Sequence, residues 1–487
     1  MSTAHLTELN EQLVYSILEF LDSLSLSRSA QTCYLLQTLA TIILHDKPHW
    51  TTLTMKAVGS AVDSDLLKIL PEEVRGAQGR VGQAFNTVFM FPTLARRSKR
   101  VTDEDMLDVK KLEAMLPKTC MGIGCAAHEI TGVSTDSFAK GAMQGSYDTT
   151  SGSLSLANFP DCVRMVFNVS SVTSAEAALA QTPTMPGEGD WKVIMILSNG
   201  SGDIQGYIEA LEKRHPGAEI IGGFHGNSHA YMIDQGKLTT PTGIVGMCIG
   251  GNVVYSSQIS RACKPLSDVY EITKCQADEE DAAVNEVTLG DKKASGAQYV
   301  QEAFNELQKG PSPARMMFFG VTEDVEKGFE LANIHGLDRH GSVHVTRPRT
   351  EGDLVGTKTR LFTLDIVSSK ADVAARLKAA KRKAEGQSKE VLGSILVTCG
   401  GRSTGFYGEP AVEAGIFQEQ LGGVGMSGFF SGGEIGPDAR GGLPYDSDFR
   451  GKTEIQGFTS VFGVFFVPTY KPTWEVMNAK LMARMTT

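Results

Sequence analysis

Cysteine is scarce in this chain, and long apolar runs are missing from it. Eight cysteines are scattered through 487 residues, a pattern that favours free thiols in a reducing compartment over a disulfide framework. No apolar run approaches the roughly 18 residues of a membrane-spanning helix. The N-terminal MSTAHLTELNEQ lacks the charged and then apolar segments of a secretory leader. We therefore expect a cytoplasmic or nuclear location, or both, and no membrane contact.

Positive charge is also in deficit. With 46 Lys and Arg against 56 Asp and Glu, the net charge is −10, which disfavours a general nucleic-acid or anionic-membrane surface. Residues 200–206 miss the GxGxxG spacing and no Walker lysine follows a glycine loop, so we expect no nucleotide and no other cofactor. Cys120, Cys125 and His128 have no second pair at zinc spacing, so no metal site is expected.

Residues 6–50 form a helical segment with almost no glycine. Leu9, Leu13, Ile17 and Leu21 recur every four residues, which predicts a wide apolar helical stripe. Two further short helices are expected before the segment ends at Trp50. Residues 51–80 mix charges and glycines and are predicted to form a linker with one short helix.

From about residue 80 a strand–helix–strand unit recurs. We predict three copies, with paired strands at 87–92 and 119–125, at 193–197 and 219–226, and at 394–398 and 425–432. Residues 244–249 and 252–259 flank a Gly-Gly pair and predict a β-hairpin. Helices are predicted at 298–308 and 371–385. Helical and strand segments alternate, so the expected fold class is α/β, or layered α+β, with mixed sheets covered by helices.

The most distinctive segment is Gly428–Pro437, in which four glycines, two aromatics and Glu434 share ten residues. It predicts a buried strand that ends in a tight loop, and sites often lie in such loops. We expect its residues to form a cleft with the ends of the other repeats. The expected cleft residues are Cys399, Arg402, Gly428, Phe429, Gly432, Gly433, Glu434 and His225.

Two interpretations of this cleft stand side by side. In one, Arg402 anchors an anionic ligand opposite Glu434, because a guanidinium offers a fork of donors to a carboxylate. In the other, Arg402 and Glu434 form an internal salt bridge that joins two loops. A nucleophilic Cys399 is a weaker hypothesis, because it requires a nearby base such as His225.

The two parts of the chain resemble two known modules. The N-terminal pattern resembles the F-box, a helical module that docks a Skp-family adaptor; its matching adaptor-binding positions are Leu9, Leu13, Ile17, Phe20, Leu21, Leu24 and Trp50. Cys399–Arg402, Gly428–Pro437 and Gly457–Thr459 resemble a FIST C-terminal domain. Leu112–Gly132, 193–197 and Ile220–Gly226 resemble a FIST N-terminal domain.

This resemblance implies a three-helix F-box at 1–50, a linker at 51–80, a FIST N-terminal domain at 81–260 and a FIST C-terminal domain at 261–487. It implies a non-catalytic substrate receptor of an SCF-type ubiquitin ligase. The F-box would hold the adaptor and the cullin scaffold, and the FIST domains would recruit a client protein for ubiquitination and proteasomal degradation. The alternative is an intracellular signal-transduction sensor that binds a small ligand; a cysteine-dependent enzyme comes third.

Overall fold

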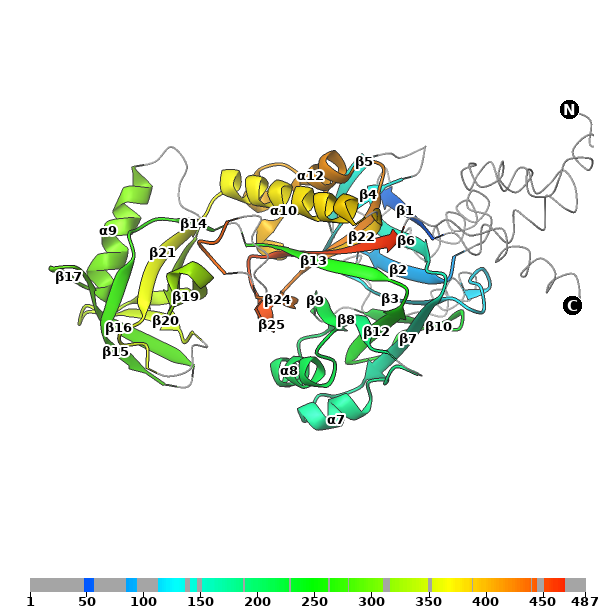
Figure 1. Cartoon of the computed structure of the whole chain (residues 1–487), viewed down its shortest axis with the longest axis horizontal. Helices are drawn as coiled ribbons and strands as arrows, with labels where there is room; N and C mark the ends of the chain where they lie inside the picture. Colours follow the sequence, from blue (N-terminus) through cyan, green and yellow to red (C-terminus); the bar gives the residue numbers. More distant parts are fainter. Residues whose placement is uncertain are drawn as a thin grey trace, which may run out of the picture.

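The computed structural model describes residues 48–56, 85–93, 113–135, 141–146 and 151–468, with short gaps at 187–188, 227–228, 262, 279, 310–315, 349–352, 388, 439 and 445–450. The described part is rich in strands, and its helices cover sheets rather than form a bundle (Figure 1). The predicted F-box helices lie outside the described residues. Among the described residues, no helix is long and apolar enough to cross a bilayer.

Three six-stranded mixed sheets build the larger part of the fold. Sheet 1 has the order β1 (His49–Lys56), β6 (Ser151–Asn158), β2 (Thr87–Pro92), β3 (Met121–Cys125), β10 (Ala230–Asp234), β11 (Lys237–Thr239). Sheet 2 has the order β13 (Val254–Ser260), β26 (Ser460–Pro468), β22 (Lys389–Cys399), β23 (Gly425–Ser431), β4 (Glu129–Ser134), β5 (Gly141–Ser146). Sheet 3 has the order β25 (Thr453–Gln456), β24 (Glu434–Pro437), β9 (Glu219–Phe224), β8 (Trp191–Ser198), β12 (Ile244–Gly251), β7 (Cys162–Val169).

Each of the three sheets contains one parallel pair that comes from one predicted strand–helix–strand unit. The pairs are β2 with β3, β8 with β9, and β22 with β23. The strands of a pair are joined through helices. Helix α8 (Ile204–Arg214) connects β8 to β9, and η2 (Gly400–Arg402), α11 (Thr404–Tyr407) and α12 (Val412–Leu421) connect β22 to β23. The predicted recurrence of this unit is thus confirmed at the level of strand pairing.

Each parallel pair contains a glycine that lies directly against the backbone of the partner strand. Gly122 is paired with Val88, Gly222 with Ile196, and Gly428 with Leu396. A Cβ atom at these glycines would lie 2.3, 1.7 and 2.1 Å from the carbonyl oxygen of the paired residue. Glycine is therefore required there because only a residue without a side chain lets the two backbones approach so closely.

The three sheets share one apolar core, and Trp50 lies inside it. The Trp50 side chain is 7% exposed and stacks on Phe89 with ring centroids 5.5 Å apart. It also contacts Phe159 and Phe465. Two expectations are therefore wrong: Trp50 is a core residue that no adaptor could reach, and the boundary between F-box and linker at 50/51 falls inside β1, which pairs with β6.

Helices cover the outer faces of the sheets (Figure 1). The long α10 (Ile366–Gly386) packs with α12 over sheet 2, and α8 packs with α7 (Ala175–Ala180) beside sheet 3. Aspartates start two of these helices: Asp203 Oδ1 accepts from the Gly206 amide (2.8 Å) and Asp365 Oδ1 from the Ser368 amide (2.9 Å). Such side-chain acceptors satisfy amides that have no partner within the helix.

The fourth sheet closes on itself and is contiguous in sequence. Its strands are β14 (Cys263–Pro265), β15 (Tyr270–Ala277), β16 (Asp281–Leu289), β17 (Lys292–Ser295), β18 (Met317–Thr322), β19 (Glu330–Leu337), β20 (Val343–Thr346) and β21 (Lys358–Leu364). Closure arises because β21 pairs with both β15 and β18. With α9 (Gly296–Gln308) on its outside, this closed sheet forms the left lobe in Figure 1.

The two expected domains, 81–260 and 261–487, follow one another in the sequence but share their sheets. Strands β24 and β25 complete sheet 3 beside β9, and β4 and β5 complete sheet 2 beside β23. The two halves of the sequence thus interleave. The predicted hairpin at 244–259 is wrong, because β12 pairs with β7 and β8 in sheet 3, whereas β13 pairs with β26 in sheet 2.

Candidate functional site

The ends of two repeats meet, as the glycine-rich loops suggested. The Phe224 amide donates to the Gly433 carbonyl (3.0 Å), and the Gly432 amide donates to the Phe224 carbonyl (3.1 Å). The Phe224 amide is also 2.8 Å from the Ser431 hydroxyl oxygen. Backbone and hydroxyl bonds thus fasten the end of β9 to the turn between β23 and β24.

Arg402 does not pair with Glu434. Its Nε donates to Glu413 Oε1 (2.7 Å) in the first turn of α12, and its side chain is fully buried. The terminal nitrogens donate to the Ser260 carbonyl and hydroxyl, the Phe458 carbonyl and the Tyr407 hydroxyl. A guanidinium has five N–H groups, so these five bonds leave none for a ligand. Both earlier interpretations of Arg402, as an anion anchor and as the partner of Glu434, are wrong.

Both carboxylate oxygens of Glu413 also accept hydrogen bonds. Its carboxylate accepts from the hydroxyls of Thr398 (2.9 Å), Tyr407 (2.8 Å) and Ser460 (2.8 Å), in addition to Arg402. These residues come from β22, α11 and β26. A buried ion pair is tolerated when hydrogen bonds satisfy its remaining atoms, so the pair serves as a structural junction.

Glu434 is a buried carboxyl group with only one of its two oxygens hydrogen-bonded. It is 0% exposed, and its Oε2 accepts from the Thr459 hydroxyl (2.9 Å) and amide (3.3 Å). Oε1 has no hydrogen-bond partner within the described part of the chain. Burial raises the pKa of Glu434 well above its ordinary value, because the charged form is poorly solvated.

Cys399 lies next to Glu434 at the end of β22. Burial, and then the Glu434 carboxylate, raise the pKa of the Cys399 thiol to about 11. A nucleophilic cysteine needs the opposite shift, because the thiolate is the reactive form. The geometry therefore gives Cys399 the properties of an inert thiol.

The other expected cleft residues separate into two groups. Gly428 and Phe429 lie within the sheet 2 core, where Phe429 stacks on Phe91 with centroids 5.3 Å apart, so neither lines a cleft. Gly432, Gly433 and His225 lie at the joined strand ends, and only Gly432 among these three is exposed. The expected cleft is therefore filled by the loops that were to form its walls.

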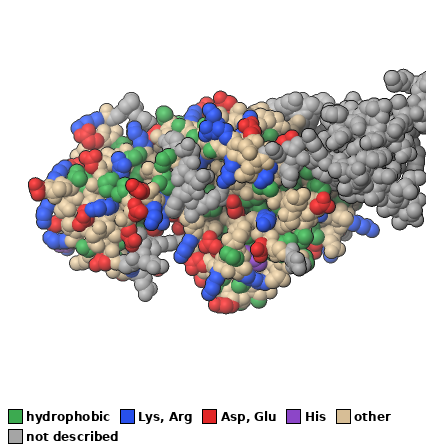
Figure 2. Space-filling view, in the orientation of Figure 1, with side chains coloured by type: hydrophobic (Ala, Val, Ile, Leu, Met, Phe, Trp, Pro, Cys, Tyr) green, Lys and Arg blue, Asp and Glu red, His purple; other side chains and the backbone are tan. Residues whose placement is uncertain are grey.

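A pocket does lie nearby, between the closed sheet and β25. Its volume is about 180 Å³. Arg261 lines the pocket from the segment before the closed sheet, and Glu454–Phe458 line it from β25 and the residues after it. The closed sheet contributes Phe318, Glu330–Asn333 and Thr346–Pro348. Figure 2 shows an indentation between the lobe of the closed sheet and the rest of the molecule, with acidic and basic side chains interspersed around it.

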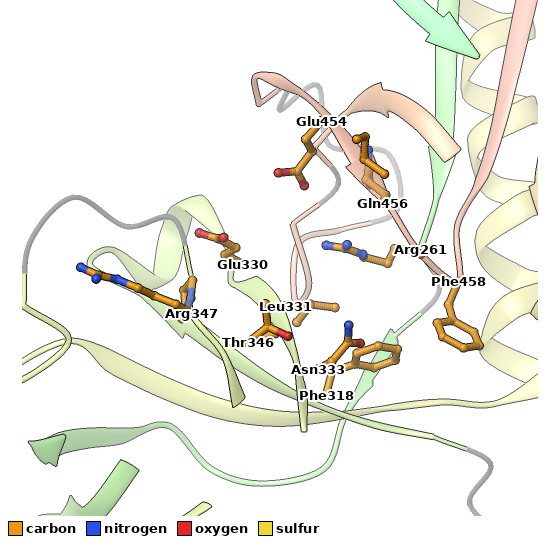
Figure 3. Close-up of a pocket in the computed structure, with 14 residues that line it drawn as sticks. Arg261, Phe318, Glu330, Leu331, Asn333, Thr346, Arg347, Glu454, Gln456 and Phe458 are labelled. Carbon is orange, nitrogen blue, oxygen red and sulfur yellow. The ribbon is translucent and has the colours of Figure 1, made fainter. Parts of the chain in front are cut away.

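Arg261 is the guanidinium that projects into this pocket (Figure 3). Its side chain is 11% exposed, and its Nη1 lies 3.7 Å from Asp438 Oδ1. The Arg347 side chain points away from the other labelled residues and donates to the Asp278 carbonyl. Glu330 and Glu454 contribute carboxylates, and Phe318 and Phe458 contribute two aromatic rings.

Among the described residues, no group of three or more His, Cys, Asp or Glu side chains is arranged to hold a metal ion.

Comparison with protein families finds matches to two successive regions of the chain. Residues 87–284 match the FIST N domain and residues 297–437 match the FIST C domain. The chain is a FIST-domain protein.

Two mycobacterial relatives of this FIST-domain protein are named as uncharacterized proteins. One from Mycobacterium tuberculosis is 25% identical over 280 residues, which cover 53% of this chain and 63% of that protein. One from Mycobacterium bovis is 23% identical over 269 residues, which cover 51% and 61%. The match thus spans less than two thirds of the length of these relatives. Among solved structures, T. maritima PurL complexed with ATP aligns over 86% of this chain and 72% of that one, with 10% identity and a TM-score of 0.19. A TM-score this low does not indicate a shared fold.

The pocket of this FIST-domain protein draws on both matched regions and on a segment beyond them. Arg261 belongs to the FIST N match, Phe318–Pro348 to the FIST C match, and Glu454–Phe458 follows it. Sequence reasoning missed Arg261, Glu330 and Gln456 because they lie far apart in the chain. One signal was available: Gly457–Thr459, singled out as a motif, begins in the pocket wall.

Proposed function

We propose that the FIST region is a small-ligand-binding sensory module and that the pocket between the closed sheet and β25 is its ligand site. The observation that carries the proposal is the composition of this pocket. Charged, amide and aromatic side chains from both FIST matches converge on one cavity, and ligand sites commonly combine an apolar surface with a few converging polar groups.

The pocket wall is connected to the buried polar junction. The Phe458 carbonyl accepts from Arg402 Nη1 (3.3 Å), and the adjacent Thr459 donates to Glu434. Phe458 has a φ of 59°, in the left-handed region that non-glycine residues seldom adopt. A ligand that moves Phe458 would thereby disturb the contacts of Arg402 and Glu434, which gives pocket occupancy a route to the core.

A thermal-shift screen tests this proposal. Polar metabolites grouped by charge are added to the full chain, and a true ligand raises Tm; at 100 times Kd the expected stabilisation is about 2.7 kcal/mol. Thr346→Trp, which fills the pocket, abolishes the shift, whereas His340→Trp at an exposed turn preserves it. A ligand that shifts both variants equally binds elsewhere and contradicts the proposed site.

The ubiquitin-ligase role remains a second proposal, and the N-terminal sequence is its support. The leucine pattern of residues 9–24 resembles the F-box, and the order of F-box and FIST domains resembles F-box only protein 22. In this proposal a Skp-family adaptor and a cullin scaffold bind the F-box, and the FIST region binds the client without catalysing a reaction.

Co-purification tests the adaptor link. Full-length protein retains a Skp-type adaptor, and Leu13→Glu with Ile17→Glu loses it while far-ultraviolet circular dichroism is unchanged. Failure of the wild-type chain to retain any such adaptor removes the receptor proposal and leaves the sensor proposal intact.

A further inference from the structure

Strand β7 leaves one long edge of the fold open. It is the last strand of sheet 3, and its eight residues pair with β12, with no strand on the other side in the described part of the chain. Figure 1 shows β7 at the end of sheet 3 that lies farthest from the closed sheet. The outward amides and carbonyls of such a strand are a template for pairing with another strand, so proteins usually block them.

The other outer strands of sheets 1 to 3 are blocked in this way. On four of them, backbone amides donate to side-chain oxygens of neighbouring segments: Thr52 of β1 to Thr135, Leu238 of β11 to Glu113, Ser257 of β13 to Glu219, and Thr453 and Ile455 of β25 to Glu212 and Gln205. The fifth, β5, packs beside α12, and its Gln144 side chain accepts from the Ala411 amide at the start of that helix. Among the described residues, no comparable bond reaches the backbone of β7.

Charge does not protect this edge either. Arg164 is the only charged residue of β7, which also contains no lysine and no proline. The Arg164 Nη1 donates to the Asn86 carbonyl (2.6 Å) and lies 3.3 Å from the Thr87 hydroxyl oxygen, so the guanidinium is held against sheet 1. The pairing with β12 is regular from Cys162 to Val169, without a bulge. None of the common devices that keep an edge strand single is present in β7.

The sequence of β7 is complementary to itself when two copies run antiparallel. A two-fold axis perpendicular to the sheet places side chains of the same face opposite each other. With the axis at Val166, the opposed pairs are Val166 with Val166, Arg164 with Asn168, Met165 with Phe167, and Val163 with Val169. Apolar residues then meet apolar residues, and the single cation meets an amide instead of its own copy. With the axis at Met165, Arg164 would lie opposite Val166.

We propose that β7 is a homodimerisation edge, at which two copies of the chain pair antiparallel about Val166. The six strands of sheet 3 in one copy then continue into the six of the other. This dimer depends neither on the pocket nor on the adaptor link. The contact is small beside the roughly 20–30 residues a side of a standard interface, so we expect a reversible dimer whose population rises with protein concentration.

Sedimentation velocity of the full chain over a range of concentrations measures this equilibrium. Val166→Lys places two like charges opposite each other on the axis, and we expect it to raise the dissociation constant at least about fivefold. Val325→Lys is the matched control, because Val325 is 44% exposed and lies outside sheet 3; it leaves the dissociation constant unchanged. Far-ultraviolet circular dichroism and Tm verify that both variants are folded.

Val166→Cys provides a test that holds even if the lysine variant fails to fold. Directly opposed residues of an antiparallel pair have Cβ atoms about 4.5–5.5 Å apart, close to the reach of a disulfide. Diamide, which takes up the two electrons and two protons of the thiols, is expected to convert this variant to a covalent dimer. Lys192→Cys, at an exposed position of β8, is expected to crosslink no more than wild type.

Three outcomes overturn the inference. The first is a wild-type chain that stays monomeric at every concentration. The second is a dimer that Val166→Lys does not weaken and Val166→Cys does not crosslink, which places the contact on another surface. The third is a monomeric chain whose β7 pairs instead with an extended segment of a different protein.

Discussion

At the scale of single residues, the buried pair Arg402–Glu413 is the most consequential. Removing one partner leaves the other charge buried without compensation, which costs about 3–5 kcal/mol. We expect Arg402→Met to lower the free energy of unfolding by that amount in urea titrations. Lys370→Met breaks the more exposed Lys370–Glu409 pair and is expected to cost less than about 1 kcal/mol. Equal effects of the two substitutions would contradict a structural role for Arg402.

Glu434 gives the protein a specific pH dependence. Burial raises its pKa from 4.5 to about 8, so between these values the folded protein holds a proton that the unfolded chain releases. Stability contributed by this group is therefore present below the unfolded pKa and falls as pH rises toward 8, by up to about 1.4 kcal/mol per pH unit.

Glu434→Gln removes this titration and flattens the profile, while the Gln side-chain oxygen can still accept from Thr459. Urea midpoints between about pH 5 and 8 test the difference. Identical slopes for wild type and variant would show that Glu434 titrates normally.

The site shows why residue pairing was hard to infer from sequence. Arg402 was expected to lie opposite Glu434, either across a bound anion or in a direct salt bridge, because both lie in glycine-rich repeat ends. Its partner is instead Glu413, in the first turn of α12, and helical periodicity alone gives no sign that this glutamate is buried. The pocket was missed for a related reason: its wall combines Arg261, Glu330 and Gln456, and only the three-dimensional path of the chain brings them together.

At the scale of elements, the paired glycine of each repeat sets the approach of two strands. Gly428→Ala places a Cβ 2.1 Å from the Leu396 carbonyl oxygen, so the strands must separate. We expect a loss of at least about 2 kcal/mol, comparable to overpacking a core. Gly415→Ala on α12 is the control: a Cβ there meets no atom within 4 Å, and the helix should gain up to about 1 kcal/mol. Differential scanning calorimetry distinguishes the two.

Elements defined by periodicity were largely predictable, and their pairing partners were less so. The strand–helix–strand units follow from local pattern, because a parallel neighbour reached through a helix is the usual connection. The Gly250–Gly251 pair predicted a hairpin, yet β12 continues to Gly251 and β13 crosses to sheet 2. A glycine pair predicts that the chain turns, but it does not predict which sheet the next strand joins.

At the scale of the whole molecule, the boundary between the two FIST matches is not a structural boundary. It falls between 284 and 297, within the closed sheet. We expect fragment 1–296 to lack a cooperative unfolding transition, because it loses β22, β23 and β26 of sheet 2 and β24 beside β9. Fragment 263–364 retains all strands of the closed sheet and its own core and is expected to unfold cooperatively. Circular dichroism of both fragments during urea titration is the test; a sigmoidal transition in 1–296 alone would contradict it.

The contiguity of the closed sheet has a further consequence for the history of the fold. Its first and last strands are neighbours, with Cys263 paired to Leu364. The chain therefore leaves sheets 1 to 3 and returns to them at nearly the same point, and the closed sheet is an insertion between them. A segment inserted at one point can be gained, lost or exchanged in one genetic event that removes no strand of sheets 1 to 3. Its loss would expose Phe406 and Tyr407, which pack against it. A FIST relative without the closed sheet would keep the Arg402–Glu413 junction and lose one wall of the pocket. Ligand preference could therefore diverge among relatives through exchange of the closed sheet while sheets 1 to 3 stay the same.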